Sequence, residues 1–266
     1  MAEISSALVK ELRDKTGAGM MDCKKALENT AGNIEKAIEE LRKSGAAKAE
    51  KRSGRAVKLG KVVAKTTGNK GVMLEMLCET DFVARNEKFT NFAMAAAERA
   101  LAAAGNGDVS ATVQESEKSA LVELIGAIGE NMQIRRAARW ESAGLIVIYL
   151  HMGGRIGVMI DVEGETDQAV LNDICMHIAA YRPSYVKPSD IPADVIAKEK
   201  EIAAAQLKDK PAEMVEKIVM GKINKWHGEV CLMKQPWLRD DKTSIEKLKP
   251  GLKVNRFVRW ETGEEL

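Results

Sequence analysis

The stretch GVMLEMLCETD, residues 71–81, alternates between two sets of side chains, as is typical of a β-strand. Val72, Leu74, Met76 and Cys78 form one set, and Met73, Glu75 and Leu77 form the other. A similar stretch, GVMIDVEGETD, follows at residues 157–167. Each copy comes after another strand-like run and before a helical pattern. The middle of the chain is therefore predicted to contain two related halves, each built from strands followed by a helix.

The two copies differ directly after the shared ETD, where the first has Phe82 and the second has Gln168. A fold requirement common to both copies does not need an aromatic side chain there, so the difference favours a task specific to the first copy. We expect residues 80–85 to form a loop and Asn86 to cap the helix that follows. The alternative is that Phe82 only staples that helix, and the polar residues around it argue against this.

The chain has enough apolar residues to form hydrophobic cores, since 45% of its 266 residues are hydrophobic. Its 41 basic and 39 acidic residues nearly balance, so net charge argues neither for nor against a nucleic-acid or membrane partner. The four cysteines are far apart, which predicts buried, reduced thiols without disulfides or zinc. The longest apolar run, residues 143–150, is too short to span a bilayer. We expect a cytoplasmic protein without an export signal.

The periodicity divides the chain into parts. Three short helices are expected at the N-terminus, the third capped by Asn33 and ended at Ser44-Gly45. Two narrow apolar stripes, interrupted at residues 209–211, predict a projecting helical hairpin. The expected division is an N-terminal module at 1–54, a first core subdomain at 55–143, a second core subdomain at 144–187 and 229–240, the hairpin at 188–228, and a C-terminal module at 241–266.

Basic residues accumulate after the third helix, with Glu50 as the one acidic counterweight. They are Lys48, Lys51, Arg52, Arg55, Lys58, Lys61, Lys65 and Lys70. A solvated linker is favoured over a phosphate-binding stripe, because no aromatic residue is interleaved for base stacking.

The residues that catalysis usually needs are sparse. His151, His177 and His227 are the only histidines, and none has a metal-ligand spacing. Sequence patterns of nucleophile elbows, P-loops and dinucleotide-binding loops are absent. The glycines after His151 are better explained by a hairpin turn than by a phosphate cradle, because strand-like runs flank them. An enzyme is therefore disfavoured, and no cofactor or metal is expected.

Two longer motifs, LRDKTGAGMMDCKKAL at 12–27 and TDFVARN at 80–86, resemble signatures of the elongation factor Ts family. Members of that family are guanine-nucleotide exchange factors for the GTPase elongation factor Tu. The resemblance extends over nearly the whole chain, including IGENMQIRR at 128–136 and HMGGRIGV at 151–158. It implies an α+β fold with an N-terminal ubiquitin-associated-like three-helix module, a core of two related α+β subdomains with antiparallel sheets, an inserted coiled-coil hairpin and a short C-terminal module.

The resemblance also implies a site. The turn formed by Thr80, Asp81, Phe82 and Val83 is expected to enter the GTPase domain of elongation factor Tu near its Mg²⁺, so that GDP leaves and GTP can bind. Asp81 and Phe82 are the expected working side chains. Further expected partner contacts are Arg13, Met20, Met21, Lys24, Ile128, Gly129 and His151.

Each of these residues also has a structural explanation. Asp81 can cap a turn, and His151 can be a satisfied structural histidine. Gly129 can simply end a helix in a left-handed cap. Met20 and Met21 are adjacent on a helix, so at most one can point fully inward and at least one should be exposed.

The alternative function is an RNA- or ribosome-binding protein that uses the basic stretch and the hairpin. A steep salt dependence of RNA binding would distinguish it from a salt-tolerant GTPase partner. The hairpin also offers a surface for a homodimer or a two-to-two complex. No membrane partner and no direct nucleic-acid partner are expected on the favoured interpretation.

Overall fold

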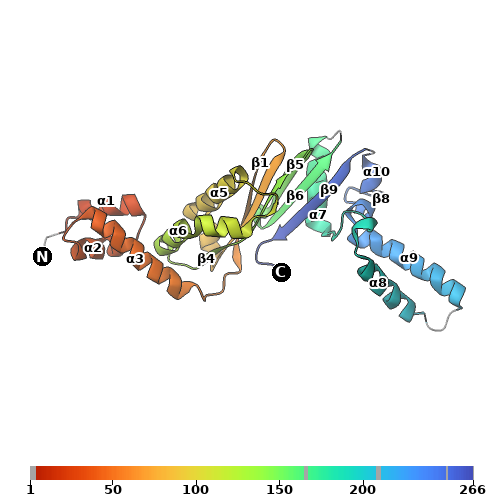
Figure 1. The fold of residues 1–266 in the computed structure, drawn as a ribbon, viewed down its shortest axis with the longest axis horizontal. Coiled ribbons are helices and arrows are strands. Elements are labelled where there is room, and N and C mark those ends of the chain that lie inside the picture. The colour runs from red at the N-terminus through yellow and green to blue at the C-terminus, as the bar shows by residue number, and fades with distance from the viewer. Residues whose placement is uncertain (1–3, 165–166, 208–210, 250, 266) are drawn as a thin grey trace.

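The computed structural model describes residues 4–164, 167–207, 211–249 and 251–265. The molecule is elongated, with a helical module at the N-terminal end, two β-sheets in the middle and a helical hairpin at the opposite end (Figure 1). The described sheets are antiparallel and are combined with helices, as predicted for an α+β fold. The five-part division of the chain stays a prediction.

The N-terminal module contains α1 (Ser6–Thr16), α2 (Met20–Asn29) and α3 (Ile34–Arg52). The Asn33 side chain accepts a hydrogen bond from Lys36 N and caps α3, as predicted. The predicted end of this helix at Ser44-Gly45 is wrong, since α3 continues for two more turns. Gly45 packs against Gly126 of α6 (Ser110–Ile128), and the small residues let the two helices approach closely.

The basic stretch is not a linker, which corrects the prediction. Lys48, Lys51 and Arg52 belong to α3, and Lys61 and Lys65 belong to β1. Several of these cations form ion pairs with acidic side chains. The pairs are Lys48–Asp22, Arg55–Glu79, Lys65–Glu98 and Lys70–Glu141.

The first half of the core is the segment from β1 to β4. It contains β1 (Leu59–Thr67), β2 (Lys70–Cys78), α4 (Asp81–Ala84), α5 (Glu87–Ala102), β3 (Gly107–Asp108), α6 and β4 (Met132–Glu141). The sheet order is β1-β2-β4-β3. The predicted alternation of β2 is confirmed, because Val72, Leu74 and Met76 pack under α5 and α6 while Met73 faces the other sheet. The strand β4 was not predicted.

The second half of the core repeats this plan. It contains β5 (Leu145–His151), the 3-10 turn η1 (Met152–Gly154), β6 (Ile156–Glu163), α7 (Gln168–Tyr181) and β9 (Lys253–Glu261). The sheet order is β5-β6-β9, and α7 covers its outer face (Figure 1). The predicted pair of related halves and the hairpin turn after His151 are therefore confirmed. Glu165 and Thr166 of the second ETD lie outside the described residues.

The remaining elements lie between α7 and β9. They are η2 (Pro188–Asp190), α8 (Ala193–Ala205), α9 (Ala212–Val230), η3 (Leu232–Lys234), β7 (Pro236–Trp237), β8 (Asp240–Ser244) and α10 (Ile245–Leu248). The helices α8 and α9 form the predicted hairpin, which projects from the core (Figure 1). Of the predicted break at 209–211, Asp209 and Lys210 lie outside the described residues.

The glycine and the methionine of the shared GVM motif lie where the two sheets pack face to face. A Cβ added to Gly71 would lie 2.3 Å from Ile146 Cγ2, and one added to Gly157 would lie 2.6 Å from Val62 Cγ1. Each half therefore uses its glycine to admit a β-branched side chain of the other half. The cluster between the sheets consists of Val62, Met73, Ala138, Trp140, Ile146, Met159 and Trp260.

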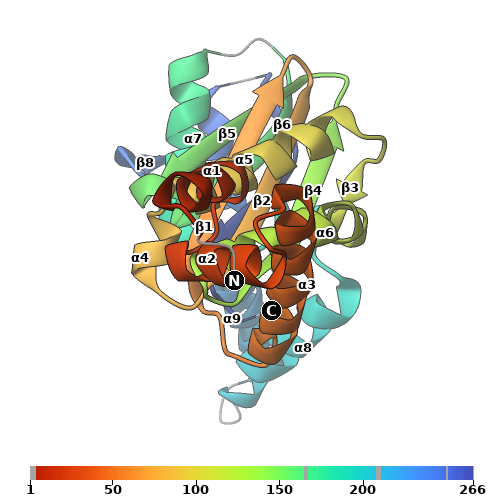
Figure 2. The same ribbon diagram turned by 90° about the vertical axis from the view of Figure 1, so that its left-hand side faces the viewer.

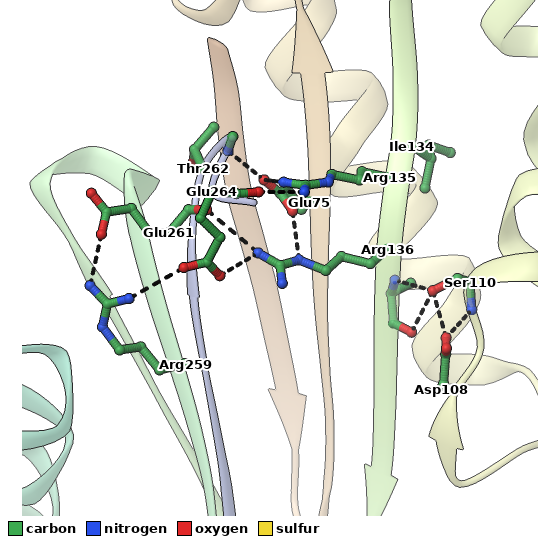
Figure 3. Close-up of polar contacts among 12 residues, drawn as sticks. Glu75, Asp108, Ser110, Ile134, Arg135, Arg136, Arg259, Glu261, Thr262 and Glu264 are labelled. Atoms are coloured by element: carbon green, nitrogen blue, oxygen red, sulfur yellow. Dashed lines mark hydrogen bonds and ion pairs between the residues drawn. The ribbon is translucent and has the colours of Figure 1, made fainter. Parts of the chain in front are cut away.

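A second repeat occupies the third strand of each sheet. RAARWE at 136–141 in β4 matches RFVRWE at 256–261 in β9. Pairing places Arg136 opposite Glu75, and Arg136 Nε lies 2.6 Å from the carboxylate (Figure 3). Glu75 is fully buried and also accepts from Arg135 and from the backbone N–H of Gly263 (Figure 3).

The equivalent pair in the second half is Arg256 and Asp161, at 3.0 Å. Each of these arginines also stacks on the tryptophan of the other half's repeat. The guanidinium of Arg256 lies 4.4 Å from the ring of Trp140, and that of Arg136 lies 4.6 Å from the ring of Trp260. The buried charges are thus paired within each half and stacked across the halves, which joins the two sheets by reciprocal contacts.

Candidate functional site

The segment after β2 presents Phe82 to solvent. Phe82 is 82% exposed, whereas Phe89 on the following helix, α5, is fully buried. The idea that Phe82 staples the following helix is therefore wrong. The expected loop is also wrong in part, because residues 81–84 form the single helical turn α4. We call residues 80–85 the Phe82 turn.

Local hydrogen bonds explain why this segment is helical. The Thr80 hydroxyl accepts from Val83 N at 3.4 Å and caps the turn. Backbone bonds from Ala84 N to Thr80 O and from Arg85 N to Asp81 O close it. Asp81 stands in the first turn and pairs with Arg85 at 3.2 Å, an arrangement that the helix dipole favours.

The Phe82 turn is anchored from within. Val83 is 7% exposed and packs in the core of the first half. Thr80 donates twice to Glu130, from its backbone N at 3.0 Å and from its hydroxyl at 2.7 Å. Thr80, Val83 and Ala84 therefore face the protein, and Asp81, Phe82 and Arg85 are exposed.

The N-terminal module presents a second apolar surface. Met20 and Met21 are 57% and 74% exposed, so the expectation that at least one is at the surface is confirmed. Arg13 and Lys24 are also exposed. Lys88 Nζ donates to Gly17 O at 3.1 Å, which joins the turn before α2 to the beginning of α5. The module and the helix that follows the Phe82 turn are thus linked at this end of the molecule, which faces the viewer in Figure 2.

The end of α6 lies close to the Phe82 turn. Gly129 ends the helix with a left-handed φ of 92°, as the structural interpretation predicted. Ile128 and Gly129 are half-buried and directly precede Glu130, the partner of Thr80. His151 belongs instead to the second half, at the end of β5, where its Nδ1 lies 2.9 Å from the Tyr149 hydroxyl. Next to it, Met152 is 66% exposed and was not predicted as a site residue.

The charges behind the Phe82 turn are ordered by hydrogen bonds. Glu79 accepts from Asn131 N at 2.6 Å and pairs with Arg55 at 3.4 Å. These contacts, the Asn131 bond first, hold the pKa of the Glu79 carboxyl below its ordinary value. Cys78 donates from its thiol to Thr80 O, and burial raises the pKa of that thiol to about 12. Cys78 is therefore a protonated structural residue and not a nucleophile.

Besides the Phe82 turn, the cysteines, one hollow and the potential metal ligands are places where chemistry could occur. The four cysteines are buried free thiols, as predicted. A hollow of about 240 Å³ between the N-terminal module and α6 is lined by charges that are already paired, Lys48 with Asp22 and Arg42 with Glu123. Within residues 4–164, 167–207, 211–249 and 251–265, no group of three or more His, Cys, Asp or Glu side chains is arranged to hold a metal ion. No helix of this described part is long and apolar enough to cross a membrane.

Comparison with known proteins gives consistent matches. A family model described as "Elongation factor TS" matches residues 79–264. An elongation factor Ts of Thioalkalivibrio sulfidiphilus is 47% identical, with 98% of this chain and 92% of the relative covered. An elongation factor Ts of Vibrio parahaemolyticus is 46% identical, with 99% and 93% covered. One of Idiomarina loihiensis is 42% identical, with 98% and 91% covered.

Proposed function

Because this chain belongs to the elongation factor Ts family, we propose that it binds GDP-loaded elongation factor Tu and promotes the release of GDP. Guanine-nucleotide exchange on elongation factor Tu is the known role of that family. The observation that carries the proposal is the exposed ring of Phe82 on a turn that Thr80 and Val83 anchor to the protein. A fully buried ring could not reach a partner.

In this proposal the residues of the Phe82 turn have different tasks. Asp81 and Phe82 enter the GTPase domain near its Mg²⁺, and Thr80 and Val83 hold the turn in place. The exposed residues of the N-terminal module and the end of α6 supply additional contacts. These proposed contacts are Arg13, Met20, Met21, Lys24, Ile128 and Gly129, with His151 contributing from the second half.

The proposed mechanism needs no covalent chemistry. An exchange factor that binds the nucleotide-free partner more tightly than the GDP-bound partner must weaken GDP binding by the same free energy. A side chain that displaces the groups around Mg²⁺ and the diphosphate has this effect, because those groups no longer offset the phosphate charge.

The expected acceleration of GDP release is too large to come from one side chain. Burial of one Phe contributes about 1.5–3 kcal/mol, which corresponds to roughly a ten- to hundred-fold change in rate. An acceleration of several thousand-fold, about 5 kcal/mol, needs further contacts. An interface above about 1,000 Å² that includes the N-terminal module would provide them.

The test uses elongation factor Tu loaded with a fluorescent GDP analogue. Addition of this protein is expected to accelerate release of the analogue in stopped-flow measurements, in the presence of excess unlabelled GDP. A release rate equal to the spontaneous rate would contradict the proposal. Because its buried thiols suit a reducing compartment, we place this activity in the cytoplasm.

A further inference from the structure

Three segments from different parts of the chain meet behind the Phe82 turn. They are the end of α3 with the following residues 53–55, the end of β2 with Glu79 and Thr80, and the end of α6 with Glu130 and Asn131. Each segment is far from the others in the sequence, yet side-chain hydrogen bonds connect all three.

Glu130 is bound to the Phe82 turn by both of its carboxylate oxygens. One accepts from Thr80 N at 3.0 Å and the other accepts from the Thr80 hydroxyl at 2.7 Å. Bonds to an ionised carboxylate are shorter and stronger than those between neutral groups. A two-point contact also fixes direction, so it sets the angle at which α4 and Phe82 leave the core.

Asn131 makes the reciprocal contacts. Its backbone N donates to Glu79 at 2.6 Å, so that Glu79-Thr80 and Glu130-Asn131 bind one another in both directions. Its buried side chain donates to Arg55 O at 2.8 Å and to Ser53 O at 3.4 Å. These two carbonyls directly follow α3, so Asn131 ties the N-terminal module to the same point.

We propose that Glu79, Glu130 and Asn131 form a clasp that holds the Phe82 turn and the N-terminal module in one fixed geometry before elongation factor Tu arrives. These are positioning residues, and they act through Phe82 and the module. The inference rests on the proposed exchange function. Without the clasp, only a fraction of molecules would present Phe82 in the competent geometry, and the apparent affinity would fall to that fraction of its value.

The experiment uses the full chain with Glu130→Ala, and with Glu130→Gln as a variant of the same shape that keeps one acceptor. Glu115→Ala is the matched control, because Glu115 lies on α6, the helix that leads to Glu130, and its side chain is 80% exposed. Amide hydrogen exchange in the free protein is the first measurement. We expect exchange at Thr80 N to rise at least tenfold in Glu130→Ala and less in Glu130→Gln. Amides within β2 and the whole Glu115→Ala control should be unchanged.

The second measurement is a double-mutant cycle of Glu130→Ala with Phe82→Ala, with nucleotide release from elongation factor Tu as the readout. Glu130→Ala alone should lower the second-order rate constant for release about tenfold, which corresponds to about 1.4 kcal/mol. In the Phe82→Ala background the same change should lower it less than twofold, because no ring remains to be positioned.

The outcomes separate this inference from the proposed function. If Phe82→Ala slows release while Glu130→Ala changes neither the rate nor the exchange of Thr80 N, the clasp is overturned and the exchange function stands. Equal effects of Glu130→Ala in both backgrounds would also overturn it, since they would indicate a general structural role. If the wild-type protein does not accelerate release at all, the proposed function fails, whereas the hydrogen-exchange result still reports on the clasp.

Discussion

The two halves of the core share their strand plan and differ where the central strand ends. In both, a glycine admits a side chain of the other sheet, and an arginine of the third strand pairs with a buried acid on the central strand. After β2 the chain forms α4 with an exposed Phe82 and a contact to Glu130. After β6 it enters α7 at Gln168, capped by the side chain of Asp167.

This comparison separates residues that hold the halves together from residues available for a partner. The glycine and methionine of the shared GVM motif, and the first arginine and the tryptophan of RxxRWE, lie between the sheets, where each half contacts the other. The unshared Phe82 turn faces solvent at the end that also carries Met20 and Met21. We infer that the repeated residues mainly stabilise the fold and that the unrepeated turn carries the function.

The largest difference between the halves should appear when their buried acids are removed. Glu75→Ala removes the buried partner of Arg135 and Arg136, whose side chains are only 17% and 13% exposed, and leaves Arg136 paired with Glu264 alone. We expect a loss of about 3–5 kcal/mol in the free energy of unfolding. Asp161→Ala should cost about 1–3 kcal/mol, because Arg256 is 37% exposed and can be hydrated. Urea unfolding of both variants measures these losses in stability. An equal or larger loss for Asp161→Ala would contradict the expected difference between the two halves.

The two inter-sheet glycines should behave alike. Gly71→Ala and Gly157→Ala each place a methyl group within 3 Å of a packed side chain. Each should cost about 1–3 kcal/mol in the free energy of unfolding by overpacking. Gly221→Ala in α9 is the control, since no atom lies within 4 Å of the added carbon. That change should stabilise the protein by about 0.5–1 kcal/mol, and a neutral result at either inter-sheet glycine would show that the sheets do not pack as closely as described.

Acidification should produce a smaller effect. The pKa of Glu79 is lowered by its bond from Asn131 N, so its contribution to stability is fully present above its ordinary pKa of 4.5. That contribution is lost as the pH falls through the lower pKa of the folded state. The free energy of unfolding should therefore decrease below pH 4.5, and it should decrease less steeply in Glu79→Gln. Identical acid dependence of the two proteins would remove Glu79 from the clasp as an ionised acceptor.

The sequence predicted those parts of the fold that depend on local periodicity. The alternation in β2, the caps at Asn33 and Asn86 and the hairpin turn after His151 follow from neighbouring residues alone. The continuation of α3 past Gly45 could not be predicted from neighbouring residues, because it depends on a contact with Gly126, 81 positions away. The sequence also singled out Phe82 through its absence from the second copy; its exposure is observed, and its role stays a prediction.

Other parts of the site depend on pairs that only the folded chain brings together. Glu130 and Asn131 lie inside the motif IGENMQIRR, yet their partners Thr80 and Arg55 are 50 and 76 positions away in the sequence. No local pattern indicates such pairs. The repeat RxxRWE was available as a signal, and a comparison of residues 136–141 with 256–261 would have predicted β4 and its match to β9.

The most direct test of the role of Phe82 compares equivalent positions of the two halves. Phe82→Ala and Gln168→Ala are each assayed for release of a fluorescent GDP analogue from elongation factor Tu. Phe82→Ala should slow the accelerated release roughly ten- to hundred-fold while complex formation remains detectable, and Gln168→Ala should leave the rate unchanged. A Phe82→Ala variant that releases GDP as fast as the wild-type protein would contradict the central claim.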